Sequence, residues 1–240
     1  MSVPVMDLAS YSLQDFIPFT ADVYFRLLAR MGEAFWPLQS VTLLVGFLAL
    51  FLSLTGRVRI ALGLLAPLWA FVGVAFFAQR YSGLNWAGTH ICWIWLCQGL
   101  LLLLLAVTGW GTALERDTGA DWRTALLRTL LTPSVQAGLL IALCGLLGFP
   151  LLGVAMGNGW PAVEVFGLHP DPTAAVTLGL LLVGFRGSAL WFTALVPTLW
   201  LCVSALTLKV LGAAWYPALL VIVAVAVTGS VASYRPRTAR

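Results

Sequence analysis

Residues 88–110 read GTHICWIWLCQGLLLLLLAVTGW, a stretch without any Asp, Glu, Lys or Arg. At 1.5 Å per residue, a helix over this stretch covers about 34 Å, which is enough to cross the roughly 30 Å hydrocarbon core of a bilayer. The whole chain has the same character, because 61% of its 240 residues are hydrophobic and only 9% are charged. Soluble proteins carry about 25% charged residues. The sequence therefore predicts an all-α fold, a polytopic membrane helical bundle.

Six further apolar segments flank this stretch, so we expect about seven transmembrane helices. The fifth segment is short, since a helix over 173–185 rises only about 20 Å, and the alternative for it is a re-entrant hairpin arm. Shielding by the rest of the protein is one way for so short a helix to lie in a membrane. The expected segments are 36–54, 60–77, 88–110, 135–156, 173–185, 189–208 and 215–232.

The chain divides into three parts in this interpretation. Residues 1–34 form an N-terminal segment with an amphipathic helix, which Thr20 is placed to cap. Val23, Leu27 and Met31 recur at helical spacing with charged residues between them, so we expect this helix to lie in the membrane interface. Residues 35–233 form a single transmembrane domain, and 234–240 form a basic tail.

The basic residues are distributed unevenly between the two sides that seven spans define. Nine of the 13 fall on one side, whereas a re-entrant fifth segment would remove this bias. Lys and Arg are retained on the cytoplasmic side, so we expect a multi-pass protein of the inner (plasma) membrane with its N-terminus outside and its C-terminus cytoplasmic. Because the basic residues are scattered between apolar segments, they give no indication of a nucleic-acid partner. The nine are Arg57, Arg59, Arg116, Arg123, Arg128, Arg186, Arg235, Arg237 and Arg240.

Polar groups and helix breaks in apolar segments are the first candidates for a site, because they are costly in hydrocarbon. Glu33 precedes the first span, where a carboxylate binds a cation, relays protons or caps a helix. Gln98 lies in mid-span, and we expect its amide to hydrogen-bond another helix. Pro150 interrupts a glycine-rich span, a pattern that either lines a substrate path or only permits close packing. Gly153 and Gly157 form a G-x-x-x-G helix-packing motif.

The seven-span topology also places His90, His169, Glu164 and Asp171 near the same outer boundary. His90 and Cys97 share one helix face, and imidazole and thiolate are good ligands for copper or zinc. A metal or haem site that uses His90, Cys97 and His169 is therefore one hypothesis. The alternative is structural, with Asp171 capping the helix that follows it. This second interpretation predicts no cofactor.

Several strings along the chain carry a family resemblance. They are IPFTADVYF (17–25), GEAFWPLQ (32–39), LGFPLLG (147–153) and FGLHPDPT (166–173). In this order they resemble an uncharacterised bacterial membrane family, domain of unknown function 6064. The resemblance implies a single polytopic domain with no assigned activity. The chain departs from the family pattern at Asp171, where the family has Cys, and at His90, which has no family equivalent.

Motifs typical of enzymes are absent: there is no G-x-S-x-G, no Walker lysine loop and no H-E-x-x-H. We therefore expect a non-enzymatic protein, permease- or channel-like for a small solute or ion, with the lipid bilayer as its surroundings. One alternative is a structural or accessory subunit packed against other membrane-protein subunits of a larger complex. Another is an outer-face metal or haem binder. The scarcity of charge in the apolar segments argues against an ion-coupled pump.

Overall fold

The computed structural model describes residue 14 and residues 17–112 and 130–234. Within these residues the secondary structure is helical and contains no β-strand. Short π-helical turns, η3 (Val72–Ala78) and η5 (Cys144–Gly148), continue α3 and join α6 to α7. The α-helices are α1 (Ala21–Ala34), α2 (Leu38–Leu54), α3 (Val58–Phe71), α4 (Ala87–Thr108), α6 (Pro133–Leu143), α7 (Phe149–Ala155), α8 (Pro170–Gly184), α9 (Gly187–Val210) and α10 (Tyr216–Tyr234).

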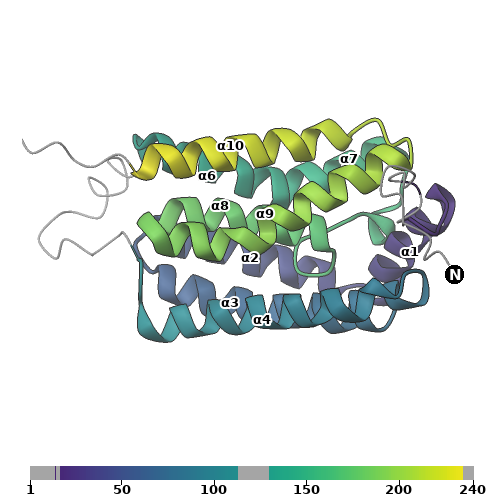
Figure 1. The fold of residues 1–240 in the computed structure, drawn as a ribbon, viewed down its shortest axis with the longest axis horizontal. Coiled ribbons are helices and arrows are strands. Elements are labelled where there is room, and N and C mark those ends of the chain that lie inside the picture. The colour runs from purple at the N-terminus through teal and green to yellow at the C-terminus, as the bar shows by residue number, and fades with distance from the viewer. Residues whose placement is uncertain (1–13, 15–16, 113–129, 235–240) are drawn as a thin grey trace, which may run out of the picture.

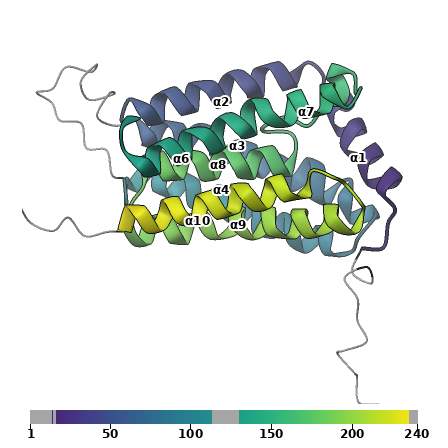
Figure 2. The same ribbon diagram turned by 90° about the horizontal axis from the view of Figure 1, so that it is seen from above.

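The long helices lie side by side along one axis, and α1 crosses one end of the bundle (Figures 1 and 2). Five described helical segments are long and apolar enough to span a bilayer, with α1 and α2 together giving a sixth if their 88° bend lies within one span. The chain is therefore a multi-pass membrane protein. A count of seven spans stays a prediction. The five segments are Val58–Gly83, Ala87–Thr108, Pro133–Ala155, Gly187–Val210 and Tyr216–Ser233.

The short fifth segment forms α8, which is buried along its whole length. It packs against α2, α3, α6, α9 and α10, so protein rather than lipid surrounds it. The connection that leads into α8 is buried as well, through Val163, Val165 and Leu168. Neighbouring helices thus shield this helix of 15 residues from lipid. Shielding by the rest of the protein is the explanation that the sequence analysis offered for so short a segment.

Glycine allows α8 to approach α6 closely. A Cβ atom on Gly179 would lie 2.5 Å from the backbone nitrogen of Ala142 and from the carbonyl oxygen of Gly138. Small residues at helix crossings allow backbones to come together in this way. On the α3 side of α8, the indole nitrogen of Trp69 donates a 2.8 Å hydrogen bond to the hydroxyl of Thr177.

The N-terminal helix α1 is amphipathic, as the sequence predicted. Tyr24, Leu28 and Met31 are buried against the bundle, while Arg26 and Arg30 are exposed. Thr20 stands at the N-cap position, but its side chain makes no capping hydrogen bond. Because α1 is turned by 88° from α2, it runs across the end of the bundle rather than along it. This is the orientation expected of a helix that lies in the membrane interface.

Arginines at the opposite end of the bundle bond helix carbonyls. The Arg59 guanidinium donates to the carbonyl oxygens of Ala106, at 2.8 Å, and of Val107, near the end of α4. Arg186 donates to the carbonyl oxygen of Leu182 at 2.7 Å, near the end of α8. Cations stabilise helix C-termini, where free carbonyls and the helix dipole are negative. The remaining arginines of the predicted cytoplasmic set, except Arg57, lie outside the described residues.

Candidate functional site

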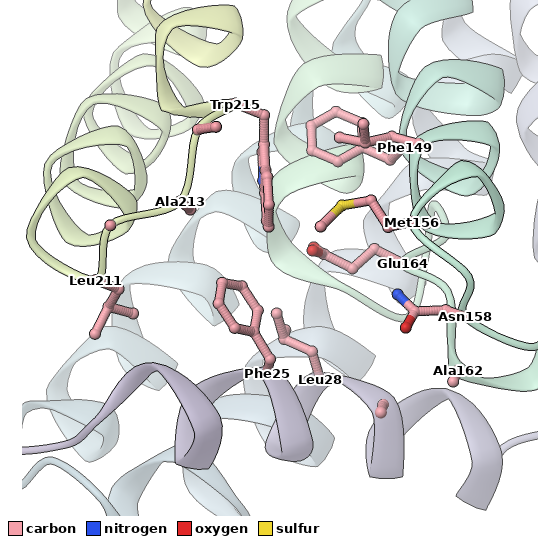
Figure 3. A pocket seen from close by; sticks show the side chains of 15 residues that line it. Phe25, Leu28, Phe149, Met156, Asn158, Ala162, Glu164, Leu211, Ala213 and Trp215 are labelled. Atoms are coloured by element: carbon pink, nitrogen blue, oxygen red, sulfur yellow. The ribbon is translucent and has the colours of Figure 1, made fainter.

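A pocket of about 520 Å³ opens at the α1 end of the bundle, and Glu164 lies within it (Figure 3). Its walls come from α1, from α7 and the connection after it, and from the α9–α10 connection. The Glu164 carboxyl group lies among the side chains of Phe25, Met156 and Trp215. The lining residues are Phe25, Leu28, Ala29, Phe149, Leu152, Gly153, Met156, Asn158, Ala162, Glu164, Leu211, Gly212, Ala213, Ala214 and Trp215.

The environment of Glu164 disfavours a negative charge. Its Oε2 atom is buried and has no hydrogen-bond partner within the described part of the chain. Burial raises the pKa of the Glu164 carboxyl well above its usual range, and the nearby negative charge of Asp171 raises it further. In the pocket this carboxyl group therefore holds a proton more tightly than an exposed glutamate does.

Asp171 lies close behind Glu164 and is held by two donors from α9. The indole nitrogen of Trp200 donates to Oδ1 at 2.8 Å, and the hydroxyl of Ser204 donates to Oδ2 at 2.6 Å. Only 3% of the residue is exposed. The expectation that Asp171 caps the following helix is wrong, because α8 begins at Pro170 and His169 stands at the N-cap position. The carboxylate instead joins α8 to α9.

His169 is fully buried and both of its ring nitrogens are engaged. Nδ1 accepts a hydrogen bond from the backbone N–H of Val165 at 3.1 Å, so the proton resides on Nε2, which donates to the carbonyl oxygen of Leu28 at 3.0 Å. Burial lowers the pKa of His169 to about 4, although these backbone bonds act in the opposite direction. The neutral ring fastens the connection before α8 to α1.

The proposed metal set is not brought together. His90 and Cys97 lie on an exposed face of α4, where His90 packs edge-on against Trp86, whereas His169 has no free ring nitrogen. Among the described residues no group of three or more His, Cys, Asp or Glu side chains could hold a metal ion. The joint site of His90, Cys97 and His169 is therefore a wrong prediction. His90 and Cys97 do share one face of α4, but this face points away from the bundle and therefore from His169.

The other predicted polar positions lie away from the pocket. Glu33 is exposed near the end of α1. Gln98 is buried, and its Nε2 donates to the carbonyl oxygen of Thr193 at 3.0 Å, which links α4 to α9. Pro150 is buried in the first turn of α7, while its neighbours Phe149 and Leu152 line the pocket.

The predicted G-x-x-x-G motif does not form a helix crossing. Gly157 lies beyond the end of α7 with φ +87°, a conformation that favours glycine, and a Cβ atom added there would have no other atom within 4 Å. Gly153 does make a close approach, since a Cβ atom on it would lie 2.8 Å from Cγ1 of Val163. Gly153 therefore allows α7 to pack closely against the connection that carries Glu164, and Gly157 allows the chain to turn after α7.

The sequence interpretation grouped Glu164 with His169 and Asp171 at one boundary but did not select it as a site residue. Its signal was local: Glu164 stands between Val163 and Val165, in a run of apolar residues outside the expected spans. A carboxylate with apolar neighbours on both sides indicates burial. Its contact with α1 and with the α9–α10 connection depends on residues distant in the sequence, which spacing alone does not reveal.

The chain matches the family described as "Family of unknown function (DUF6064)" over residues 21–239. This match covers the helical bundle, and the chain belongs to that family. Comparisons with curated proteins and with solved structures found no match. The function therefore has to be inferred from the chemistry of the pocket.

Proposed function

We propose that this protein is permease-like and binds a small organic cation in the pocket around Glu164. The observation that carries the proposal is a carboxyl group in a pocket lined mostly by apolar side chains, with one buried oxygen that finds no partner among the described residues. Small-molecule sites typically measure roughly 300–1,000 Å³ and combine apolar walls with a few polar groups. A pocket of about 520 Å³ with Glu164 as its acidic group fits this description.

The aromatic walls of the pocket favour an ammonium group over an inorganic cation. Phe25 and Trp215 pack together, with their ring centroids 5.5 Å apart, and both line the pocket. Aromatic faces attract organic cations, by about 0.5–2 kcal/mol per contact. An inorganic divalent cation needs several oxygen ligands instead, and Glu164 and Asn158 supply few. A carboxylate beside two aromatic rings is suited to an amine or a quaternary ammonium ion.

Protonation of Glu164 couples solute binding to pH in this proposal. Burial and the charge of Asp171 favour the neutral acid of Glu164. A bound cation favours the ionised carboxylate, so binding expels a proton from the pocket. The affinity for the cation therefore rises as the pH rises toward the raised pKa of Glu164. The apolar segments themselves contain few charged residues, and in this proposal Glu164, which lies outside them, supplies the buried carboxylate that responds to pH.

Orientation and compartment belong to the same proposal. We infer insertion in the inner membrane with the C-terminus in the cytoplasm, supported by the nine basic residues that seven spans place on that side against four on the other. The pocket then opens toward the outer side. The alternative of an accessory subunit has no specific support, because apolar residues exposed on the described helices are equally explained by contact with lipid.

Uptake into proteoliposomes tests the proposal. The purified full-length protein is reconstituted and supplied with radiolabelled choline, a small quaternary ammonium ion. We expect uptake above that of empty vesicles, and a loss of at least about tenfold in Glu164→Gln, which removes the negative charge. Glu33→Gln is the matched control, since Glu33 is exposed and does not line the pocket.

Two results would contradict the permease proposal. One is choline uptake by wild type that does not exceed uptake by empty vesicles. The other is equal uptake by wild type and Glu164→Gln at matched amounts of reconstituted protein.

A further inference from the structure

A second groove, of about 330 Å³, lies beside α1 and shares no residue with the Glu164 pocket. It is lined by three arginines and three aliphatic residues. Arg26 and Arg30 come from α1, one helical turn apart, and Arg80 comes from the segment after η3. Leucine and valine complete the walls. The lining residues are Val23, Arg26, Leu27, Arg30, Arg80 and Leu84.

The positive charges in this groove have no acidic partner among the residues that line it. Arg26 and Arg30 make no hydrogen bond or ion pair within the described part of the chain. Asp22 and Glu33 are exposed on the same helix, but neither lines the groove. Like charges one turn apart destabilise a helix slightly. An anion between the guanidinium groups would remove that repulsion.

Arg80 is held in place by contacts that leave part of its guanidinium free. Its Nη1 donates to the carbonyl oxygen of Ala75 at 2.6 Å, and its Cζ lies 5.0 Å from the centre of the Phe35 ring. A guanidinium group carries five N–H donors, so others remain for a ligand. Because the side chain is already ordered, an anion that binds here loses little additional conformational freedom.

The position of α1 indicates which anion this is. The helix is amphipathic and turned 88° from α2, so it crosses the end of the bundle (Figure 2). When the bundle spans a bilayer, a helix in this orientation lies at the level of the polar headgroups. Arginine binds phosphate through paired hydrogen bonds. The aliphatic side chains of Val23, Leu27 and Leu84 provide apolar contact beside these charges. A free inorganic anion would make no use of that apolar surface.

We propose that the groove formed by Arg26, Arg30 and Arg80 binds the phosphate group of an anionic lipid headgroup. The aliphatic residues contact the glycerol and the first acyl carbons. The bound lipid fixes α1, and with it one wall of the Glu164 pocket, at the membrane surface. This site stands on its own observations and does not depend on the function proposed above.

Lipid binding to the full-length protein in a neutral detergent tests the site. The probe is dioctanoyl phosphatidic acid, and its affinity is measured by native mass spectrometry for wild type and for Arg26→Gln/Arg30→Gln. The double variant keeps Arg80 and its bond to Ala75, and glutamine preserves helix propensity in α1. The control is Arg57→Gln/Lys209→Gln, which removes two exposed cations elsewhere. We expect the affinity to fall at least about tenfold in the double variant and by less than twofold in the control.

Three results would overturn the proposal. The first is equal affinity of wild type and Arg26→Gln/Arg30→Gln for the lipid. The second is an equal loss in the control, which would indicate general attraction to a basic protein. The third is inorganic phosphate binding as tightly as the lipid in a parallel titration, which would assign the groove to a free anion. Circular dichroism of the lipid-free variants verifies that α1 and the bundle are intact.

Discussion

At the residue scale, the buried polar groups near the start of α8 are each held by a partner from another element. Asp171 accepts hydrogen bonds from Trp200 and Ser204 of α9, and His169 bonds the backbone of α1. Buried polar groups are costly unless they are paired in this way. Glu164 is the exception, because its Oε2 has no partner among the residues that the structure describes. In the proposed function, a cation bound in the pocket would compensate this carboxyl group.

The buried neutral state of His169 predicts an acid-sensitive stability. Its pKa is lowered from 6.5 to about 4 in the folded protein, so the unfolded chain takes up a proton first as the pH falls. The stabilising contribution is complete above about pH 6.5 and is lost as the pH falls toward 4. The raised pKa of Glu164 acts in the opposite direction in wild type and variant alike, so the difference between the two proteins isolates His169. In thermal denaturation in detergent, the midpoint of wild type relative to that of His169→Gln should therefore fall as the pH falls between these values. Parallel profiles for the two proteins would contradict this account.

The sequence predicted the location of these residues but not their roles. Topology placed Glu164, His169 and Asp171 at one boundary, and they do lie together around the start of α8. It also placed His90 there, but His90 faces outward on α4. Whether a side chain turns inward depends on which neighbouring helix covers it. Hydrogen-bond partners such as Leu28 and Ser204 are distant in the sequence, so no spacing rule links them to His169 or Asp171.

At the scale of elements, the close approach of α6 and α8 depends on glycine. Replacing Gly179 by alanine would place a Cβ atom 2.5 Å from backbone atoms of α6, so the helices would have to move apart. We expect Gly179→Ala to lower the free energy of unfolding by about 1–3 kcal/mol. Gly63→Ala is the matched control, because no atom lies within 4 Å of the added Cβ. In a helix this change is neutral or stabilising by up to about 1 kcal/mol.

Thermal denaturation of the two variants beside wild type measures this difference. Equal midpoints for Gly179→Ala and wild type would show that α6 and α8 tolerate separation and that the crossing is not tight.

The sequence predicted the elements better than their packing. Hydrophobic length located the long helices, and the alternation of charged and apolar residues located α1. The crossing glycines escaped detection because Gly138 and Gly179 lie on different helices, whereas the visible G-x-x-x-G pair falls where α7 ends. The sequence of α8 is apolar, and an apolar sequence is expected both for a helix that faces lipid and for one that protein surrounds. The burial of α8 could therefore not be predicted from its composition.

At the scale of the whole molecule, the two ends of the bundle differ in chemistry. One end carries α1, the Glu164 pocket and the arginine groove, and the other carries Arg57, Arg59 and Arg186. Composition alone was sufficient to predict a membrane protein. The pocket and the groove at the α1 end are formed by residues distant in the sequence, so the arginine count indicated an orientation without indicating a site.

Single cysteines at the two ends of one span test the orientation. Arg57→Cys and Gly83→Cys, in a background without the native cysteines, lie just before the start and at the end of the Val58–Gly83 segment, and both positions are exposed. A maleimide that does not cross membranes should label position 83 in intact cells and position 57 only after the cells are opened. Labelling with the reverse pattern would invert the topology and place the pocket in the cytoplasm.

The measurement that tests the central claim most directly is calorimetric titration of the full-length protein with choline and with its uncharged analogue 3,3-dimethyl-1-butanol. We predict that choline binds at least tenfold more tightly than the analogue, a difference of about 1.4 kcal/mol, and more tightly at pH 8 than at pH 6. Glu164→Gln should weaken the preference for choline and abolish its pH dependence, while Glu33→Gln should retain both. Equal binding of the charged and uncharged ligands, or a Glu164→Gln variant with the full preference and pH dependence of wild type, would contradict the assignment of this pocket to a cation.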